Sequence, residues 1–343
     1  MAKGAKLALS APEIEPVSLH RGGRDAAPGG YEAATERPDA LFGSLPSDWI
    51  ALLKPRVMTL VVFTALVGLI VAPVPMHPVL GFAAILAIAI GAGASGAINM
   101  WYDRDIDAVM RRTASRPIPA GRVPPDAALG YGVTLAVFSV ALMGLAANWV
   151  AASVLALSIA FYVFVYTMWL KRRTPQNIVI GGAAGAFPPV IGWAAATGTI
   201  DAAPLVLFAI VFFWTPPHFW ALSLFAHADY ARAGVPMLPV VAGARETRRQ
   251  VMLYTAILVP LSLAPVAMSF AGWLYGAVAV LLGLNFLRHA RAILVETQDE
   301  AGVSLARDAA AKAGFRFSIT YLFALFGALA VDRILAAGGV WGL

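Results

Sequence analysis

The sequence predicts an all-α, polytopic membrane protein with nine transmembrane helices. Hydrophobic residues make up 60% of the 343 residues and charged residues only 13%, whereas soluble domains average about 45–50% apolar and about 25% charged residues. The mean hydropathy is +0.76. A soluble enzyme of this length could not bury so much apolar surface, so the composition excludes a water-soluble fold.

The residue counts also exclude several kinds of chemistry. The chain has no cysteine and five histidines. It therefore has no disulfides, thiolate metal sites, iron–sulfur clusters or cysteine nucleophile, and a histidine-rich metal site is disfavoured. The net charge of +6 could suit nucleic acid, but the positions of the basic residues favour a role in membrane orientation.

The apolar runs are long enough for nine spans of about 20 residues each. Residues 1–46 differ from the rest, because they mix both charges with glycine and proline and contain no apolar signal-peptide core. We expect a disordered cytosolic tail there and a nine-helix domain over 47–343, entered through an interfacial stretch at 49–53. The expected spans are 57–74, 79–101, 127–147, 149–170, 178–198, 204–223, 250–270, 272–292 and 314–335.

The basic residues predict the orientation of these spans. All of the 25 lysines and arginines except Arg333 lie in the tail or in and beside the connections after the second, fourth, sixth and eighth spans. The positive-inside rule places those connections and the N-terminus in the cytoplasm. Nine spans then place the C-terminus on the periplasmic side of a bacterial inner membrane.

The strongest motif lies at the cytosolic end of the second span, where Asn99, Asp103 and Asp107 recur at every fourth residue. At about 100° per residue they form one stripe of a helix, and Asp105 points to the other side. Three oxygen ligands on one stripe suit Mg²⁺, which also takes waters and substrate phosphates. The alternative is a solvated acidic helix end. Against it, Asn99 lies inside the apolar run and the helix dipole disfavours acids at a C-terminus.

Basic residues follow this motif in two connections. They predict a metal-bridged polyphosphate, because arginine forks match phosphate oxygens. Ordinary positive-inside charge, or binding to anionic lipid headgroups, is the alternative for each of them. These residues are Arg111, Arg112, Arg116, Arg122, Lys171, Arg172 and Arg173.

A second acid, Asp229, stands alone between Asp201 and Glu246. It follows a sixth span in which Pro216 and Pro217 are expected to break or kink the helix. His218, next in the chain, could be a ligand or a base, or it could be hydrogen-bonded within the bundle.

Two glycine-rich stretches also need interpretation. Residues 91–96 match G-x-G-x-x-G, but they lie within a span and no strand precedes them, so a dinucleotide site is rejected. Residues 181–185 are expected to form a helix-packing face or a close wall for a flat ligand.

Together these motifs resemble the UbiA-type intramembrane prenyltransferases, and most closely the haem-farnesylating branch, the haem O synthases. The resemblance covers about residues 48–335 and depends on residues 101–116, 171–189, 213–220 and 229–239. It implies a nine-helix UbiA-type bundle around a central cavity. It further implies transfer of the farnesyl group of farnesyl diphosphate to the 2-vinyl group of protohaem IX (haem B), with water addition and diphosphate release, giving haem O.

The resemblance also implies Mg²⁺ as cofactor and roles for individual residues. Asn99, Asp103, Asp107 and Asp229 match catalytic positions that bind the metal. The implied substrate-binding residues are Arg112, Arg116, Lys171, Arg172, His218, Trp220 and Tyr230. The second region departs from the family pattern, because other branches pair two acids, or a tyrosine and an acid, four residues apart. Phe225 and Ala233 lie four residues before and after Asp229, so a second cation would be held mainly by diphosphate and water.

The expected partners are farnesyl diphosphate, haem B and membrane lipid, with a haem A synthase as candidate acceptor of the product and no nucleic acid. A transporter would need polar groups near the midplane, whereas these acids cluster at one rim. A UbiA-type enzyme acting on an aromatic acid such as 4-hydroxybenzoate is the other enzyme reading, and residues 174–189 and 213–220 favour haem over it. A CDP-alcohol phosphotransferase is rejected because its D-G-x₂-A-R element is absent.

Overall fold

The computed structural model describes residues 44–299 and 304–337, and the regular structure in these residues is helical apart from one isolated bridge between Gln298 and Ser304. Eight helices in this part are long and apolar enough to cross a membrane. A ninth span results if two consecutive helices that meet at 53°, α2 (Pro46–Leu52) and α3 (Pro55–Val71), are counted together. The nine-span prediction therefore holds with its first span bent. The predicted disordered tail lies outside the described residues, except for its last three positions.

The remaining long helices follow the predicted spans, and several helices of four to six residues lie between them or at their ends. Differences at their ends arise because polar first turns extend a helix beyond its apolar run, as in α12, which begins seven residues before the expected span. These helices are α4 (Pro78–Tyr102), α5 (Arg104–Val109), α6 (Pro125–Ala146), α7 (Trp149–Ala160), the π-helix η1 (Phe161–Leu170), α8 (Asn177–Thr197), α9 (Ala202–Phe225), α10 (His227–Arg232), α11 (Leu238–Val241), α12 (Gly243–Leu261), α13 (Ala264–Ala267), α14 (Trp273–Val295) and α15 (Ala309–Ala337).

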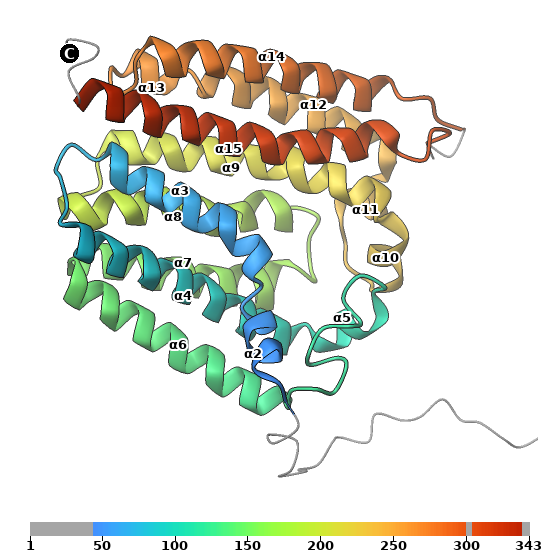
Figure 1. The fold of residues 1–343 in the computed structure, drawn as a ribbon. Helices are drawn as coiled ribbons and strands as arrows, with labels where there is room; N and C mark the ends of the chain where they lie inside the picture. Colours follow the sequence, from blue (N-terminus) through green and yellow to red (C-terminus); the bar gives the residue numbers. More distant parts are fainter. Residues whose placement is uncertain (1–43, 300–303, 338–343) are drawn as a thin grey trace, which may run out of the picture. The chain divides into compact units, whose positions relative to one another are not determined.

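Three helices, α3, α8 and α9, lie inside the bundle and have helical neighbours on both sides. α12 and α15 lie along α9, and α14 packs against both of them, while α4 with α6 lies on the other side of α8 (Figure 1). A core of large side chains, including Trp214, Tyr275 and Tyr321, joins α9 to α14 and α15. The short helices α5, α10 and α11 gather at one end of the bundle (Figure 1).

Two features of the sixth and fourth spans differ from what local sequence predicts. α9 runs from Ala202 to Phe225 as one helix with Pro216 and Pro217 inside it, so the helix does not break at the prolines. The other predicted outcome, a kink, stays a prediction. The packing of α9 against α8, α12 and α15 compensates for the backbone hydrogen bonds that the prolines remove. The span that begins with α7 ends as a π-helix over Phe161–Leu170, a form found mostly as short insertions near functional sites.

A buried ionic cluster closes the end of the bundle where α12 begins. Arg248 is 1% exposed and forms ion pairs with Glu296 at 2.7 Å and with Asp308 at 3.1 Å. The cluster ties α12 to both ends of the connection between α14 and α15.

Candidate active site

The acidic motif lies at a helix break. α4 ends at Tyr102 and α5 begins at Arg104, so Asp103 connects the two helices. The backbone N–H of Asp103 still donates to Asn99 O at 2.9 Å, and that of Asp107 to Asp103 O at 2.8 Å. The prediction of one uninterrupted helical stripe is therefore wrong, although the four-residue hydrogen-bond spacing between these residues is kept.

Asn99 is the inner member of the motif and is 3% exposed. Its Nδ2 donates to Asp103 Oδ2 at 2.7 Å and to Thr167 Oγ1 of η1 at 3.1 Å. Its Oδ1 accepts from Lys54 Nζ at 2.6 Å. Lys54 has a left-handed backbone, with φ 54°, at the bend between α2 and α3, and this bend turns its side chain toward α4.

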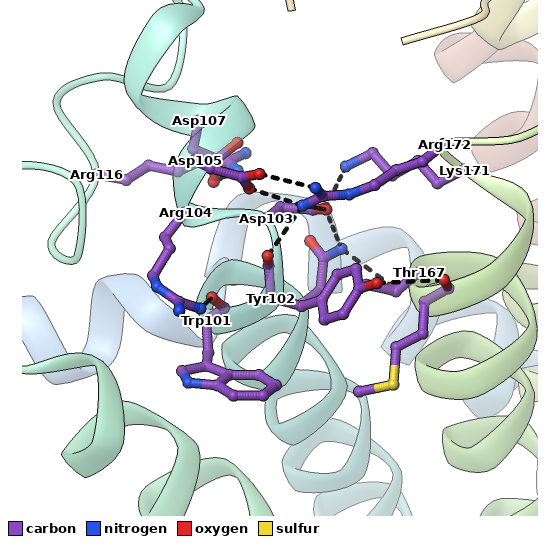
Figure 2. Close-up of polar contacts among 12 residues, drawn as sticks. Trp101, Tyr102, Asp103, Arg104, Asp105, Asp107, Arg116, Thr167, Lys171 and Arg172 are labelled. Carbon is purple, nitrogen blue, oxygen red and sulfur yellow. Dashed lines mark hydrogen bonds and ion pairs between the residues drawn. The ribbon is translucent and has the colours of Figure 1, made fainter. Parts of the chain in front are cut away.

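Two basic residues that follow η1 close over Asp103, whose side chain is fully buried (Figure 2). Lys171 donates to Asp103 Oδ2. Arg172 lies 3.5 Å from Asp103 Oδ1 and binds both carboxylate oxygens of Asp105 at 2.7 Å. The Arg172 guanidinium holds the pKa of the Asp105 carboxyl below its ordinary value, chiefly through these hydrogen bonds. Asp105 is 62% exposed, in contrast to buried Asp103, although both carboxylates lie beside the same Arg172 guanidinium.

The outer member of the motif, Asp107, is also buried and paired. Its carboxylate accepts from Arg116 at 2.6 Å, and its backbone carbonyl accepts from Thr113 Oγ1 at 2.9 Å. Arg112, in contrast, is exposed and has no contact with the motif among the described residues. The structure thus brings together two carboxylates, one amide and four cationic groups, from Lys54, Arg116, Lys171 and Arg172.

A cavity of about 430 Å³ lies beside this cluster, between α3, α4, α7, η1, α8, α9 and α15. Its walls are mainly apolar and aromatic, and Lys54 belongs both to them and to the polar cluster. The aromatic lining residues are Tyr162, Tyr166, Trp214, Phe219, Phe315 and Phe323. The cavity therefore joins a charged rim to an apolar interior.

Three glycines of α8, Gly181, Gly182 and Gly185, line the cavity. A Cβ on Gly181 would lie 2.2 Å from Tyr166 Cδ2, and one on Gly182 would lie 3.0 Å from Thr215 Cβ. A Cβ on Gly185 would meet nothing within 4 Å. Gly181 and Gly182 therefore combine close helix packing with a place in the cavity wall, whereas Gly185 only lines the cavity.

Comparison with known proteins identifies the family. Residues 61–319 match the model of the UbiA prenyltransferase family. The chain belongs to the UbiA prenyltransferase family. A protoheme IX farnesyltransferase from Acidiphilium cryptum (strain JF-5) is 65% identical over 88% of this chain and 98% of its own length. One from Granulibacter bethesdensis is 63% identical over 90% of this chain and 98% of its own length.

Solved structures share the UbiA fold at low sequence identity. Digeranylgeranylglyceryl phosphate synthase matches with a TM-score of 0.68 and 16% identity, over 84% of this chain and 98% of that chain. A UbiA homologue from Archaeoglobus fulgidus bound to DMAPP and Mg²⁺ matches with a TM-score of 0.60 and 17% identity, over 83% and 99% of the two chains. The predicted fold and family are confirmed.

The cluster at Asp103 has the donor chemistry that suits a hard divalent cation. Asp103 Oδ1 is enclosed and accepts no hydrogen bond, and Asn99, Asp103 and Asp107 offer the oxygen ligands that Mg²⁺ prefers. Within 44–299 and 304–337 no three His, Cys, Asp or Glu side chains converge as a metal site. These residues therefore fit a cation that shares its coordination with waters and a substrate diphosphate.

The second region of UbiA-family resemblance is not joined to this cluster by any contact among the described residues. Asp229 in α10 forms an ion pair with Arg232 of the same helix. Trp220 and Tyr230 are buried in an apolar cluster that also contains Ile106 and Met110, beside Asp107 in the chain. Trp220 packs edge-on against Tyr254 at 5.1 Å. His218 lines the cavity. The roles predicted for these residues remain predictions.

Sequence reasoning missed Lys54, Thr167, Tyr162 and Tyr166. Lys54 was counted only as positive-inside charge, although a lysine directly before a proline at the start of a span signals a bent entry. Tyr162 and Tyr166 lie four residues apart, a spacing that places two polar aromatic side chains on one side of a helix. Their position on a π-helix, beside Asn99, has no clear sequence signal.

Proposed function

We propose that this UbiA-family enzyme transfers the farnesyl group of farnesyl diphosphate to the 2-vinyl group of protohaem IX, adds water and releases diphosphate, giving haem O. The observation that carries this proposal is the charged rim that opens through Lys54 into an apolar cavity. Relatives more than 60% identical over nearly their whole length are named for the same reaction.

The charged rim would bind the diphosphate and drive its departure. Breaking the allylic C–O bond leaves negative charge on the diphosphate, and preorganised cationic donors stabilise that charge. Lys54, Arg116, Lys171 and Arg172 supply such donors, and Asp103 and Asp107 hold three of them in place. Asn99, Asp103 and Asp107 would hold Mg²⁺, which would supply further positive charge to stabilise the departing diphosphate. Asp229 is proposed as a contributor to a second, weaker cation position.

The apolar interior would protect the farnesyl cation. Water would quench an allylic cation, so a cavity that excludes bulk water favours its attack by the vinyl group. Ring faces stabilise cations, and Tyr162, Tyr166, Trp214 and Phe219 line the cavity. The farnesyl carbon forms a bond with the terminal vinyl carbon, the charge moves to the carbon next to the porphyrin, and water adds there with loss of a proton.

The haem acceptor would lie against the wall of the cavity that α8 forms. A porphyrin is a flat apolar plate, and Gly185 leaves that wall without a side chain. Trp220 and Tyr230 do not line the cavity, but they pack in one apolar cluster with the lining residue Ile178. Arg112 is exposed, and its proposed part in binding the diphosphate stays a prediction.

The protein is a multi-pass membrane protein, and we place it in the bacterial inner membrane with the charged rim facing the cytoplasm. Reporter fusions after Arg122, Arg173, Ala244 and Ala301 are expected to report a cytoplasmic position, and one at Leu343 a periplasmic position. A cytoplasmic C-terminus would contradict the nine-span count. A haem A synthase is the proposed acceptor of the product, and co-purification of the two proteins would test that partnership.

The function is tested by mass spectrometry of haems extracted from cells with and without this chain. Cells that express it should accumulate haem O at the expense of haem B. Unchanged haem B together with a prenylated aromatic acid would favour the alternative UbiA-type activity.

A further inference from the structure

His218 is held in one fixed orientation at the cavity wall. Its ring stacks between Trp214, with centroids 4.4 Å apart and planes at 19°, and Phe315, at 4.7 Å and 26°. Phe219 packs edge-on against it at 5.2 Å. Both ring faces are therefore covered, and only the ring edges are free to make polar contacts.

The hydrogen bonds of Ser318 fix which ring nitrogen carries the proton. Ser318 Oγ donates its one hydrogen to Phe315 O at 2.7 Å. With the hydroxyl hydrogen placed on Phe315 O, the contact of 2.7 Å between Ser318 Oγ and His218 Nδ1 has the imidazole as donor, and we assign this tautomer to His218. The backbone carbonyl of Ser318 also accepts from Trp214 Nε1 at 2.8 Å, so one residue fixes both the imidazole and the ring stacked on it.

The other ring nitrogen of His218 is free. Nε2 has no hydrogen-bond partner among the described residues, and it is not one of the enclosed unpaired atoms of this part of the chain. It therefore carries an exposed lone pair at a wall of the cavity. A neutral imidazole whose Nδ1–H is bound to an oxygen and whose Nε2 is free has the arrangement of a metal-binding histidine.

The serine and threonine hydroxyls of the cavity are less suited than an imidazole to binding iron. Those of Thr59, Thr64, Ser95 and Thr215 donate to carbonyls of their own helices, and that of Ser158 donates to Ala184 O at 3.4 Å. His218 is the only imidazole among the lining residues of this cavity. Met58 also lines it, and a Cβ on Gly93 of α4 would lie 3.2 Å from its Sδ.

We propose that His218 Nε2 is the axial ligand of the iron in the haem substrate. This inference depends on the proposed function, because it takes haem as the acceptor. Coordination forms one iron–nitrogen bond and releases no proton, since Nε2 is already unprotonated. The stacked rings and Ser318 hold the imidazole ready for the iron before the substrate enters.

The position of His218 along α9 gives the ligand a role in orienting the acceptor. His218 lies seven residues before Phe225, the last residue of α9, which is about 10 Å of helix. Asn99 lies only three residues before the end of α4, and both helices end where α5 and α10 lie (Figure 1). The iron is therefore anchored deeper than the charged rim, and the vinyl-bearing edge can turn toward that rim.

The test is a titration of the purified full chain with haem B in the absence of farnesyl diphosphate, followed by absorption and EPR spectroscopy. The wild type should show a nitrogen-ligated haem, and His218→Ala should lose that spectrum and regain it with added imidazole. His218→Met should convert it to a thioether-ligated spectrum, which a misfolded protein could not give. The control is His289→Ala, because His289 of α14 stacks on Phe317 of α15 and does not line the cavity.

A second readout separates coordination from packing. Loss of His218 should weaken haem B binding by about 10-fold or more. Losing a residue that only supports a metal ligand already lowers metal affinity by about 10-fold, and losing the ligand itself should lower it at least as much. It should leave the affinity for metal-free protoporphyrin IX unchanged. A His218→Ala protein with the wild-type haem spectrum would overturn the proposal, even if the wild type makes haem O. A wild type that shows His218-dependent ligation but makes no haem O would instead contradict the proposed reaction and leave the iron ligand standing.

Discussion

Replacing Asp103 by asparagine removes one charge from the centre of the polar cluster and keeps the size of the side chain. Asp103 is 0% exposed, accepts from Asn99 and Lys171, and lies 3.5 Å from Arg172. The variant loses a proposed Mg²⁺ ligand and the partner that positions Lys171 over the diphosphate. We therefore expect a defect in the ionisation step rather than in the binding of the farnesyl chain.

The size of the effect follows from burial. Loss of one preorganised group that stabilises transition-state charge costs about 10²–10³ in rate, or about 2.7–4 kcal/mol. Asp105→Asn is the matched control, because Asp105 binds the same Arg172 from a position that is 62% exposed. An exposed ion pair contributes at most about 1 kcal/mol, so Asp105→Asn should cost about fivefold or less.

The assay measures haem O formation by purified variants with haem B, farnesyl diphosphate and excess Mg²⁺. Thermal unfolding in detergent is measured in parallel, because breaking a buried ion pair can itself cost about 3–5 kcal/mol of stability. If folded Asp103→Asn has a rate within about threefold of the wild type, a difference of under 1 kcal/mol in the barrier, the assignment of Asp103 to the reaction is wrong. Equal losses in Asp103→Asn and Asp105→Asn would assign the effect to Arg172 instead.

Three further predictions concern the cavity, the buried cluster and pH. Gly185→Leu should abolish haem O formation while the protein stays folded and binds farnesyl diphosphate, whereas Gly181→Leu, which must displace Tyr166, should lower the unfolding temperature and lose both ligands. Arg248→Met should destabilise the protein by about 3–5 kcal/mol, since it leaves buried carboxylates unpaired, whereas its neighbour Arg249, 78% exposed, should tolerate the same change. The pKa of Asp105 lies below its unfolded value of about 3.9, so the stability that it contributes is present at neutral pH and is lost as the pH falls through the folded value. The difference in unfolding temperature between wild type and Asp105→Asn should accordingly shrink below about pH 4.

The spans could be predicted from the sequence because hydropathy alone determines which segments enter the bilayer. Their polar ends could not, because tertiary contacts extend them, as Arg248 does through its ion pairs at the start of α12. Local sequence could not decide between a break and a kink at Pro216 and Pro217 for the same reason, because packing on three sides of α9 maintains the helix. Propensity is a weak prior wherever tertiary packing opposes it.

The polar cluster at Asp103 could likewise be predicted from the sequence only in part. The four-residue spacing of Asn99, Asp103 and Asp107 predicted that these side chains belong together, because backbone hydrogen bonds keep that spacing across the break at Asp103. The partners from distant segments could not be predicted, since no local pattern places Lys54 or Thr167 beside Asn99. The tautomer of His218 depends on Ser318, which is 100 residues away in the chain.

The central claim is the identity of the prenyl acceptor, and one reconstitution tests it most directly. Purified protein is incubated with farnesyl diphosphate, Mg²⁺ and an equal mixture of haem B and 4-hydroxybenzoate, and the products are separated by mass. The cavity beside Gly185 and the free nitrogen of His218 predict haem O as the only prenylated product. Prenylated 4-hydroxybenzoate without haem O would contradict the assigned reaction and leave only the UbiA prenyltransferase fold.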